Sequence, residues 1–196
     1  YFQSSHYESW VLEDGIIKEG SHNIEQGAGI RALSGEKTGF AYSDKIDLPV
    51  LLSAVKNVQA IARQGQTAKT SLPGKAPYPA LYAPINPLSS LSDQEKVDFL
   101  RKIDAETRKL DPRIEQVIIS LVGVQDHILI ANQGSSLVGD VRPLVRMNVS
   151  VIVEEKGQRE QGSMGGGARS DYHYFLEQDR ALGFAREAVR QALVNL

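Results

Sequence analysis

The sequence has no cysteine among its 196 residues. This absence excludes disulfide bonds, thiol nucleophiles and thiolate metal sites, and it fits the reducing cytoplasm. The sequence also lacks an apolar run of membrane-spanning length. Its opening residues lack the basic and then apolar layout of a secretion signal. We therefore expect a cytoplasmic protein with no membrane partner.

Neither sign of charge dominates the chain. Lys and Arg together number 22 and Asp and Glu 24, which gives a formal net charge of -2. This balance argues against nucleic acid or an anionic membrane surface as the main partner. Hydrophobic residues make up 41% and charged residues 23%, which predicts a globular fold with its own core. The length suits one large domain or two small ones.

An initiator methionine is missing from position 1. The opening residues 1–4, Tyr-Phe-Gln-Ser, look like the remnant of a protease site used to remove a purification tag. Cleavage of such a tag would remove Tyr, Phe and Gln, however, and these residues fall where a strand is expected. We therefore interpret them as native sequence and expect the natural chain to continue upstream.

The first 64 residues predict strands followed by a helix. Asp14-Gly15 lies between alternating residues, which is a strong hairpin signal. A second hairpin is expected with residues 34–37 at its tip. The apolar period then becomes helical, and we predict a helix from about Pro49 to Gln64.

The middle of the chain predicts a connection and a second helix. Residues 65–91 are rich in proline and have no sustained period, so they indicate a long irregular loop. Ser92 and Glu95 have the spacing of a capping box. The amphipathic helix 93–109 follows and ends before Pro112. Its apolar stripe would cover the sheet or dock a partner.

Residues 114–196 again predict strands and then a helix. Turns are expected near Gln125-Asp126, at Gln133-Gly134 and at Lys156-Gly157. The two halves can be overlaid so that Asp14-Gly15 falls on Gln133-Gly134 and Gly35 falls on Gly157. This overlay suggests an internal duplication of a meander-plus-helix unit, with repeat units 1–64 and 114–196. The alternative is that any two antiparallel meanders look alike.

The pattern as a whole predicts the α+β fold class. We expect two layers, with mostly antiparallel sheets and helices on one side.

Three long strings carry a resemblance to a known family. They are YFQSSHYESWVLEDGIIKEGSHNIEQGAGIRALSGEKTGFAYSDKI, DVRPLVRMNVSVIVEEKGQREQGSMGGGAR and AREAVRQALVNL. They resemble the N-terminal region of the TldD/PmbA family of zinc metalloproteases, on the TldD side of that family. The resemblance runs the length of the chain and is weakest in the proline-rich stretch.

The resemblance implies that the catalytic apparatus lies elsewhere. The family signature is His-Glu-x-x-x-His on a helix of a later domain, where two imidazoles hold zinc beside a glutamate base. This sequence contains no such string. Its histidines, at positions 6, 22, 127 and 173, include no pair three to five residues apart. We therefore assign no catalytic, cofactor or metal residue here and expect a non-catalytic N-terminal domain that is inactive alone.

The resemblance also implies a function for the parent protein. It implies a cytoplasmic zinc-dependent peptidase that cleaves small or unfolded polypeptides, in peptide-antibiotic maturation and antitoxin degradation. Its expected partner is a TldE/PmbA-like subunit in a hetero-oligomer, or a second copy in a homodimer. The alternative is a stand-alone peptide- or protein-binding module with a gyrase-modulator type of regulatory role.

The glycine run Gly165, Gly166 and Gly167 is the main candidate for a substrate groove. It lacks the Lys-Ser or Lys-Thr context of a phosphate loop. Three glycines permit close backbone approach, so an extended peptide could pair with the strand edge. Arg169, with Tyr172 and Tyr174, would line this groove. The alternative is a flexible hairpin end or a bulge.

Two further pairs have the spacing of one strand face. Asp171 and His173 would form a metal or proton-transfer pair, or simply a structural hydrogen bond. Arg142 and Arg146 would grip a carboxylate, or form ordinary salt bridges across the sheet.

Overall fold

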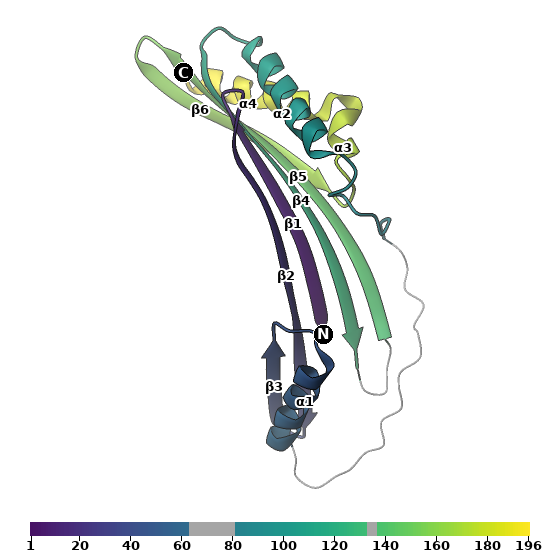
Figure 1. Ribbon diagram of the computed structural model, residues 1–196. Helices are drawn as coiled ribbons and strands as arrows, with labels where there is room; N and C mark the ends of the chain where they lie inside the picture. Colours follow the sequence, from purple (N-terminus) through teal and green to yellow (C-terminus); the bar gives the residue numbers. More distant parts are fainter. Residues whose placement is uncertain (63–80, 133–136) are drawn as a thin grey trace. The chain divides into compact units, whose positions relative to one another are not determined.

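A computed structural model describes residues 1–62, 81–132 and 137–196 of the chain (Figure 1). Six strands form one sheet in the order β3-β2-β1-β4-β5-β6. This arrangement of antiparallel strands with helices confirms the α+β fold class. The strands are β1 Phe2–Glu13, β2 Ile16–Ser34, β3 Lys37–Ser43, β4 Ile114–Ala131, β5 Leu137–Glu155 and β6 Gln158–Ala168. The helices are α1 Leu48–Ala62, α2 Asp93–Arg108, α3 His173–Leu176, the 3-10 turn η1 Glu177–Asp179 and α4 Arg180–Asn195.

The predicted hairpin turns are confirmed where the structure describes them. Asp14 and Gly15 have φ values of 51° and 74°, and Lys156 and Gly157 have values of 53° and 86°. Positive φ at both central residues is the type I′ geometry that matches strand twist. The tip between β2 and β3 is also confirmed, because Ser34 pairs with Lys37.

The turn predicted near Gln125-Asp126 is wrong. Strand β4 runs through both residues without interruption. Gln125 is buried, and the Asp126 carboxylate accepts a hydrogen bond of 2.6 Å from the Ser5 hydroxyl of β1. Because a neighbouring strand satisfies the Asp126 carboxylate, this residue does not end the strand. The segments before and after Pro143 are likewise one strand, β5.

Several predictions lie outside the described residues. They are the Gln133-Gly134 turn, the last two residues of the first predicted helix, and most of the proline-rich loop. The described part of that helix, Leu48–Ala62, begins one residue before the predicted start.

The chain forms two compact units, and each takes a part of the long strands. Unit 1 comprises residues 1–6, 24–81 and 126–142, and unit 2 comprises residues 7–23, 82–125 and 143–196. The order of three strands and then a helix occurs twice along the chain, and the sheet order is symmetric about the β1-β4 pair. This symmetry suits the predicted duplication, which stays a prediction.

In unit 1, helix α1 packs beside β3, as Figure 1 shows. Ala54 and Val58, four residues apart on α1, are buried, as is Ala28 on β2. Spacing of four residues places both side chains on one face of the helix. The helix packs against β3.

In unit 2, α2 and α4 pack together and α4 lies on β6 (Figure 1). The capping box of α2 is confirmed: the Ser92 hydroxyl accepts from the Glu95 amide, and the Ser92 amide donates to the Glu95 carboxylate at 2.7 Å. Helix α4 meets the sheet through small side chains. Its buried residues are Ala181, Ala185, Ala188, Val189 and Ala192.

A glycine lets α4 approach β6 closely. A Cβ atom at Gly162 would lie only 2.0 Å from the Ala188 carbonyl oxygen and 2.6 Å from the Ala192 nitrogen. Both are backbone atoms of the helix, so no side-chain movement would relieve the overlap. The distance between α4 and the sheet therefore depends on this residue.

Candidate functional site

The most polar part of the interior of unit 2 is a cluster around Lys96 of α2 and Glu8 of β1. Their side chains are 2% and 1% exposed, and the Lys96 ammonium lies 2.8 Å from Glu8 Oε1. Lys96 also donates to the Leu88 carbonyl at 2.9 Å, and the Tyr172 hydroxyl donates to Glu8 at 2.6 Å. A buried ion pair persists only with such further hydrogen bonds.

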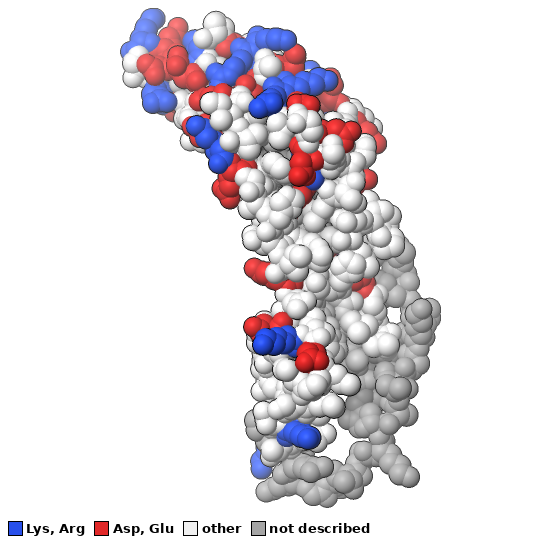
Figure 2. Space-filling view, in the orientation of Figure 1, with Lys and Arg blue, Asp and Glu red and all other residues white. Residues whose placement is uncertain are grey.

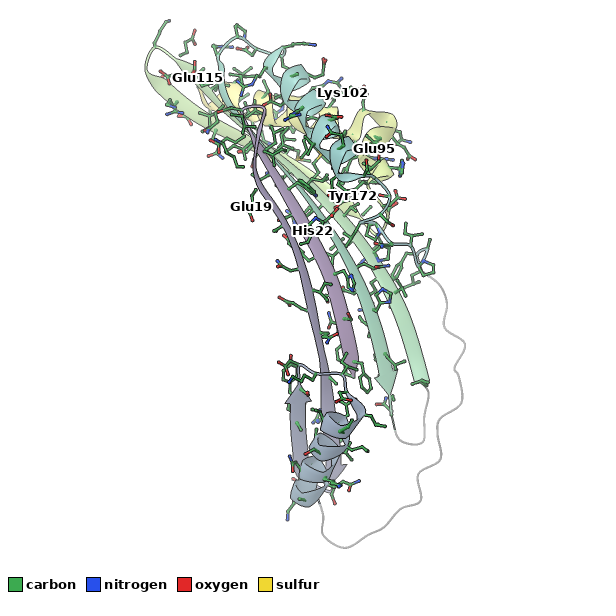
Figure 3. The ribbon with its side chains drawn as sticks, in the orientation of Figure 1. Glu19, His22, Glu95, Lys102, Glu115 and Tyr172 are labelled. Carbon is green, nitrogen blue, oxygen red and sulfur yellow. The ribbon has the colours of Figure 1, made fainter. Side chains whose placement is uncertain are left out.

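The surroundings of the cluster reinforce its charges. The Lys96 ammonium lies 5.9 Å from the Trp10 ring centre and 5.5 Å from that of Tyr172, within range of cation–π attraction. Burial, and then the hydrogen bond to Glu8, raises the pKa of Tyr172 far above its ordinary value. Tyr172 is therefore a neutral donor. Figure 3 labels it together with His22 of β2.

Glu8, His22 and Asp93 form the one group of three potential metal ligands within the described residues. Sequence reasoning missed it, because these residues are far apart along the chain. The arrangement does not fit the zinc that the resemblance implies. Both Glu8 oxygens lie within 3.1 Å of the Lys96 ammonium, and that ammonium also lies 3.4 Å from Asp93. A cation already neutralises the carboxylates, so we interpret the cluster as structural.

The predicted glycine run lies on β6, at one edge of the sheet. Gly166 faces α4, because a Cβ there would lie 2.8 Å from the Phe184 ring. A Cβ at Gly165 or Gly167 would meet backbone oxygens of β5 at 2.5 and 2.3 Å. All three glycines thus serve close packing, and their role in holding a substrate stays a prediction.

The residues predicted to line the groove separate in the structure. Tyr172 is buried in the cluster, so that it does not line a surface groove. Tyr174 lies against Arg180, whose guanidinium is 4.3 Å from the ring centre. Arg169 is exposed; it donates to the Pro143 carbonyl at 3.3 Å and lies 5.8 Å from the Tyr82 ring centre.

Three of the four residues in the two predicted pairs have structural partners. Asp171 and His173 do not lie on a strand, because α3 begins at His173. The Asp171 carboxylate accepts from the His173 amide at 3.0 Å and lies 3.3 Å from its ring nitrogen. Arg142 donates to Asp140 at 2.6 Å, and Arg146 is exposed on β5.

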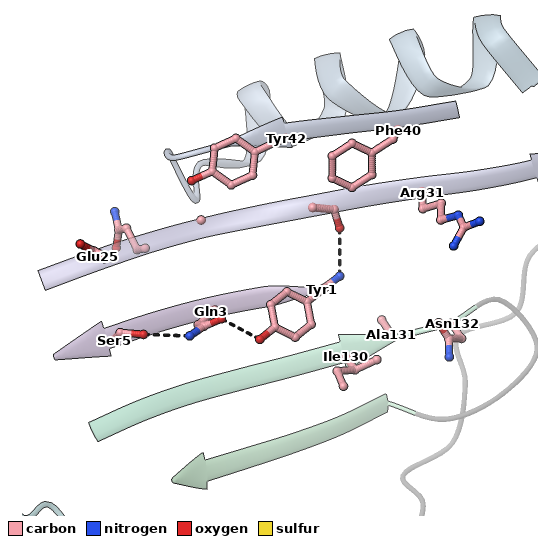
Figure 4. Close-up of a pocket in the computed structure, with 13 residues that line it drawn as sticks. Tyr1, Gln3, Ser5, Glu25, Arg31, Phe40, Tyr42, Ile130, Ala131 and Asn132 are labelled. Carbon is pink, nitrogen blue, oxygen red and sulfur yellow. Dashed lines mark hydrogen bonds between the residues drawn. The ribbon is translucent and has the colours of Figure 1, made fainter. Parts of the chain in front are cut away.

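Unit 1 contains a pocket of about 610 Å³ that sequence reasoning did not predict (Figure 4). Strands β1, β2, β3 and β4 supply its walls. Tyr1, Phe40 and Tyr42 give it three aromatic rings, and Glu25 and Arg31 of β2 give it charges of both signs. This volume is within the range of small-molecule sites.

A chain of hydrogen bonds holds the β1 wall of the pocket in place. The Tyr1 hydroxyl donates to Gln3 at 2.7 Å, and the Gln3 amide donates to the Ser5 hydroxyl at 2.9 Å (Figure 4). The Ser5 hydroxyl in turn donates to Asp126. Each donor therefore has a fixed acceptor. The wall needs little reorganisation before a ligand enters.

Charged side chains gather over the helices and hairpin tips of unit 2 on the visible face (Figure 2). Within the ranges that the structure describes, no helix has both the length and the apolar character needed to cross a membrane.

The fold is α+β, and the one three-ligand group among the described residues surrounds the Lys96 ammonium. Comparison with family models adds a family. Residues 1–62 match PmbA/TldA metallopeptidase domain 1, and residues 86–196 match the PmbA/TldA metallopeptidase central domain. The chain therefore belongs to the PmbA/TldD metallopeptidase family. The interval between the two matches, residues 63–85, lies in the predicted proline-rich loop except for its first two residues.

Curated relatives agree with this membership. Two proteins named "Metalloprotease TldD homolog", from Haemophilus influenzae and Buchnera aphidicola, are 49% and 43% identical over 100% of this chain. The chain spans 42% of the length of each of these relatives. It thus matches a TldD-type N-terminal portion over its whole length.

Solved structures share the fold at low sequence identity. A putative modulator of DNA gyrase from Bacteroides thetaiotaomicron has a TM-score of 0.75 at 15% identity. The match covers 100% of this chain and 45% of the Bacteroides chain. A putative modulator of a DNA gyrase from Thermotoga maritima has a TM-score of 0.70 at 17% identity. The match covers 98% of this chain and 42% of the Thermotoga chain. TldE from Thermococcus kodakarensis has a TM-score of 0.66 at 16% identity. The match covers 98% of this chain and 44% of the TldE chain.

Proposed function

We propose that this chain is the scaffold and substrate-access part of a cytoplasmic zinc-dependent peptidase that cleaves small or unfolded polypeptides. The observation that carries this proposal is the identity of 43–49%, over the whole chain, to relatives named as metalloproteases. The zinc ligands of such an enzyme would lie outside the part of the chain that the structure describes, because the one three-ligand group in that part already holds an ammonium.

The expected partner is a TldE/PmbA-like subunit. Support comes from the fold shared with TldE from Thermococcus kodakarensis at a TM-score of 0.66. Two chains of one fold suit a pseudo-symmetric hetero-oligomer, and a homodimer would use the same surface twice.

The decisive experiment uses the full-length polypeptide that carries this chain, with and without the TldE/PmbA-like subunit. An unstructured fluorogenic peptide is the substrate. We expect cleavage that a chelator abolishes and added zinc restores, and no cleavage by residues 1–196 alone. Cleavage that persists after zinc removal would contradict the proposed chemistry. Cleavage by the 196-residue chain would contradict its scaffold role.

We propose that the outer edge of β6, beside Gly165–Gly167, receives extended polypeptide, with Arg169 close to the bound chain. A strand edge offers unpaired backbone groups for such pairing. Arg169→Ala should raise the KM for the unstructured peptide several-fold and leave the unfolding free energy nearly unchanged. Arg186→Ala, at another exposed arginine of unit 2, is the matched control. Equal KM values in both variants would remove Arg169 from the proposal.

A second candidate function is a stand-alone regulatory module. It is favoured by the two solved structures described as putative modulators of DNA gyrase. Direct titration of the full-length polypeptide with DNA gyrase tests it. Saturable binding that changes supercoiling rate, without peptide cleavage, would favour the module over the peptidase.

A further inference from the structure

Among the residues that the structure describes, one face of unit 1 carries three exposed aromatic rings. Tyr1 is 47%, Phe40 62% and Tyr42 67% exposed. Successive side chains of a strand point to opposite faces, and Ala28 on β2 is buried on one of them. Phe40 and Tyr42 pair with Arg31 and Gly29, so they lie on the other side. Clustered exposed rings indicate a binding surface.

Two glycines form the floor of the pocket beneath these rings. A Cβ at Gly27 would lie 2.8 Å from the Tyr42 hydroxyl oxygen, and a Cβ at Gly29 would lie 3.4 Å from the Phe40 ring. The rings therefore lie across β2 instead of standing away from it. Figure 4 shows both rings above β2, with Tyr1 on the neighbouring strand. The result is a shallow aromatic trough along β2.

Opposite charges stand at the two ends of this trough. Glu25 and Arg31 both line the pocket from β2, and both are exposed. Six residues of strand at about 3.3 Å each place them about 20 Å apart. Among the described residues, neither side chain has an ion pair or hydrogen bond with another charged group. Each is therefore available to a ligand.

We propose that this trough binds a short extended peptide of about six residues with free termini. Its carboxylate would meet Arg31 and its amino group Glu25, because an extended chain covers about 3.3–3.6 Å per residue. A guanidinium binds a carboxylate through two parallel hydrogen bonds. The rings would hold apolar side chains, and the Asn132 amide would meet a peptide group.

Other ligand classes suit the trough less well. A single strand of nucleic acid needs a positively charged groove along its backbone, and this trough carries one arginine and one glutamate. A purely apolar ligand would leave both charges without a partner. The peptide assignment rests on the proposed function for its substrate class, but its test measures binding and not turnover.

The test is calorimetric titration of the full-length polypeptide with the hexapeptide Gly-Phe-Ala-Phe-Ala-Gly. Three forms are compared: unblocked, C-terminally amidated and N-terminally acetylated. We expect the unblocked form to bind about tenfold more tightly than either blocked form. Arg31→Ala should abolish the discrimination against the amidated form only, and Glu25→Ala the discrimination against the acetylated form only. Phe40→Ala should weaken all three.

Lys56→Ala, at an exposed residue of α1, is the matched control and should change none of these affinities. Circular dichroism melting verifies that each variant is folded. Absence of binding, or binding that ignores both end groups, would overturn the proposal. Self-association that Phe40→Ala abolishes, without peptide binding, would assign the trough to a second copy and also overturn it. Peptide binding without zinc-dependent cleavage would leave the trough standing and overturn the peptidase.

Discussion

Lys96 and Glu8 lie 88 positions apart in the sequence and form an ion pair inside unit 2. The Tyr172 hydroxyl and the Leu88 carbonyl complete the hydrogen bonding of the pair. Removal of one member of such a pair leaves the other as an uncompensated buried charge. The stability of unit 2 should therefore depend on both charges and on the Tyr172 hydroxyl.

Lys96→Met should lower the unfolding free energy by about 3–5 kcal/mol, because Glu8 would remain buried and unpaired. The double variant Lys96→Met with Glu8→Leu removes both charges and should cost clearly less. Urea denaturation followed by circular dichroism measures both. Equal losses in the single and double variants would contradict the coupling of the two residues.

Stability should fall at alkaline pH through Tyr172. Its pKa in the folded chain is raised above the ordinary value of 10, first by burial and then by the hydrogen bond to Glu8. The folded state holds the phenol proton more tightly than the unfolded chain does. The contribution of Tyr172 to the unfolding free energy is therefore complete below about pH 10. It is lost above that pH, by up to about 1.4 kcal/mol per pH unit.

Tyr172→Phe isolates this effect. At neutral pH the variant should be less stable by about 1.5–3 kcal/mol, the contribution of a hydrogen bond to a charged group. Between pH 9 and 11 its stability should fall less steeply than that of the parent chain. Parallel curves for the two proteins would show that Tyr172 does not carry the pH dependence.

Two glycine substitutions near α4 should have opposite signs. Gly162→Ala places a methyl group against the backbone of the helix, and we expect a loss of about 1–3 kcal/mol or more. Gly183→Ala lies within α4 with open space around it, and should gain about 1 kcal/mol through helix propensity. Thermal melting of both variants measures the pair. A Gly162→Ala variant as stable as the parent chain would refute the close contact.

Asp111 should titrate well below its ordinary range. The side-chain hydrogen bond from Arg113, together with the Arg113 backbone amide, lowers the pKa of Asp111 from 3.8 to about 2. Its contribution to stability is present above about pH 4 and is lost as the pH falls through 2. An NMR titration of the carboxyl carbon should give this value. Arg113→Ala should return the pKa toward 3.8.

Local signals made parts of the fold predictable. Asp14-Gly15 and Lys156-Gly157 adopt type I′ turns because their own backbone preferences match the twist of flanking strands. Ser92 and Glu95 cap α2 through bonds that span three residues. In each case the interacting groups are sequence neighbours, so the sequence by itself determined the outcome.

Tertiary structure decided the course of β4 and the position of Lys96. Gln125-Asp126 looks like a turn locally, but a hydrogen bond from Ser5, 121 positions away, satisfies Asp126 inside the sheet. Lys96 looks like a solvent-exposed helical residue, yet it is buried because Glu8 faces it. Ser5 and Glu8 are both far away in the sequence, so the local sequence around Asp126 or Lys96 indicates neither partner.

One candidate site was visible in the sequence, and the other appeared only in the folded chain. The sequence alone located the glycine run and established family resemblance, because both are properties of contiguous strings. The aromatic trough required the fold, because Phe40 and Tyr42 of β3 lie over Gly27 and Gly29 of β2 only once the strands are in register. Register is set by the pairing of whole strands, and it alone brings Glu25 and Arg31 to the ends of one aromatic surface.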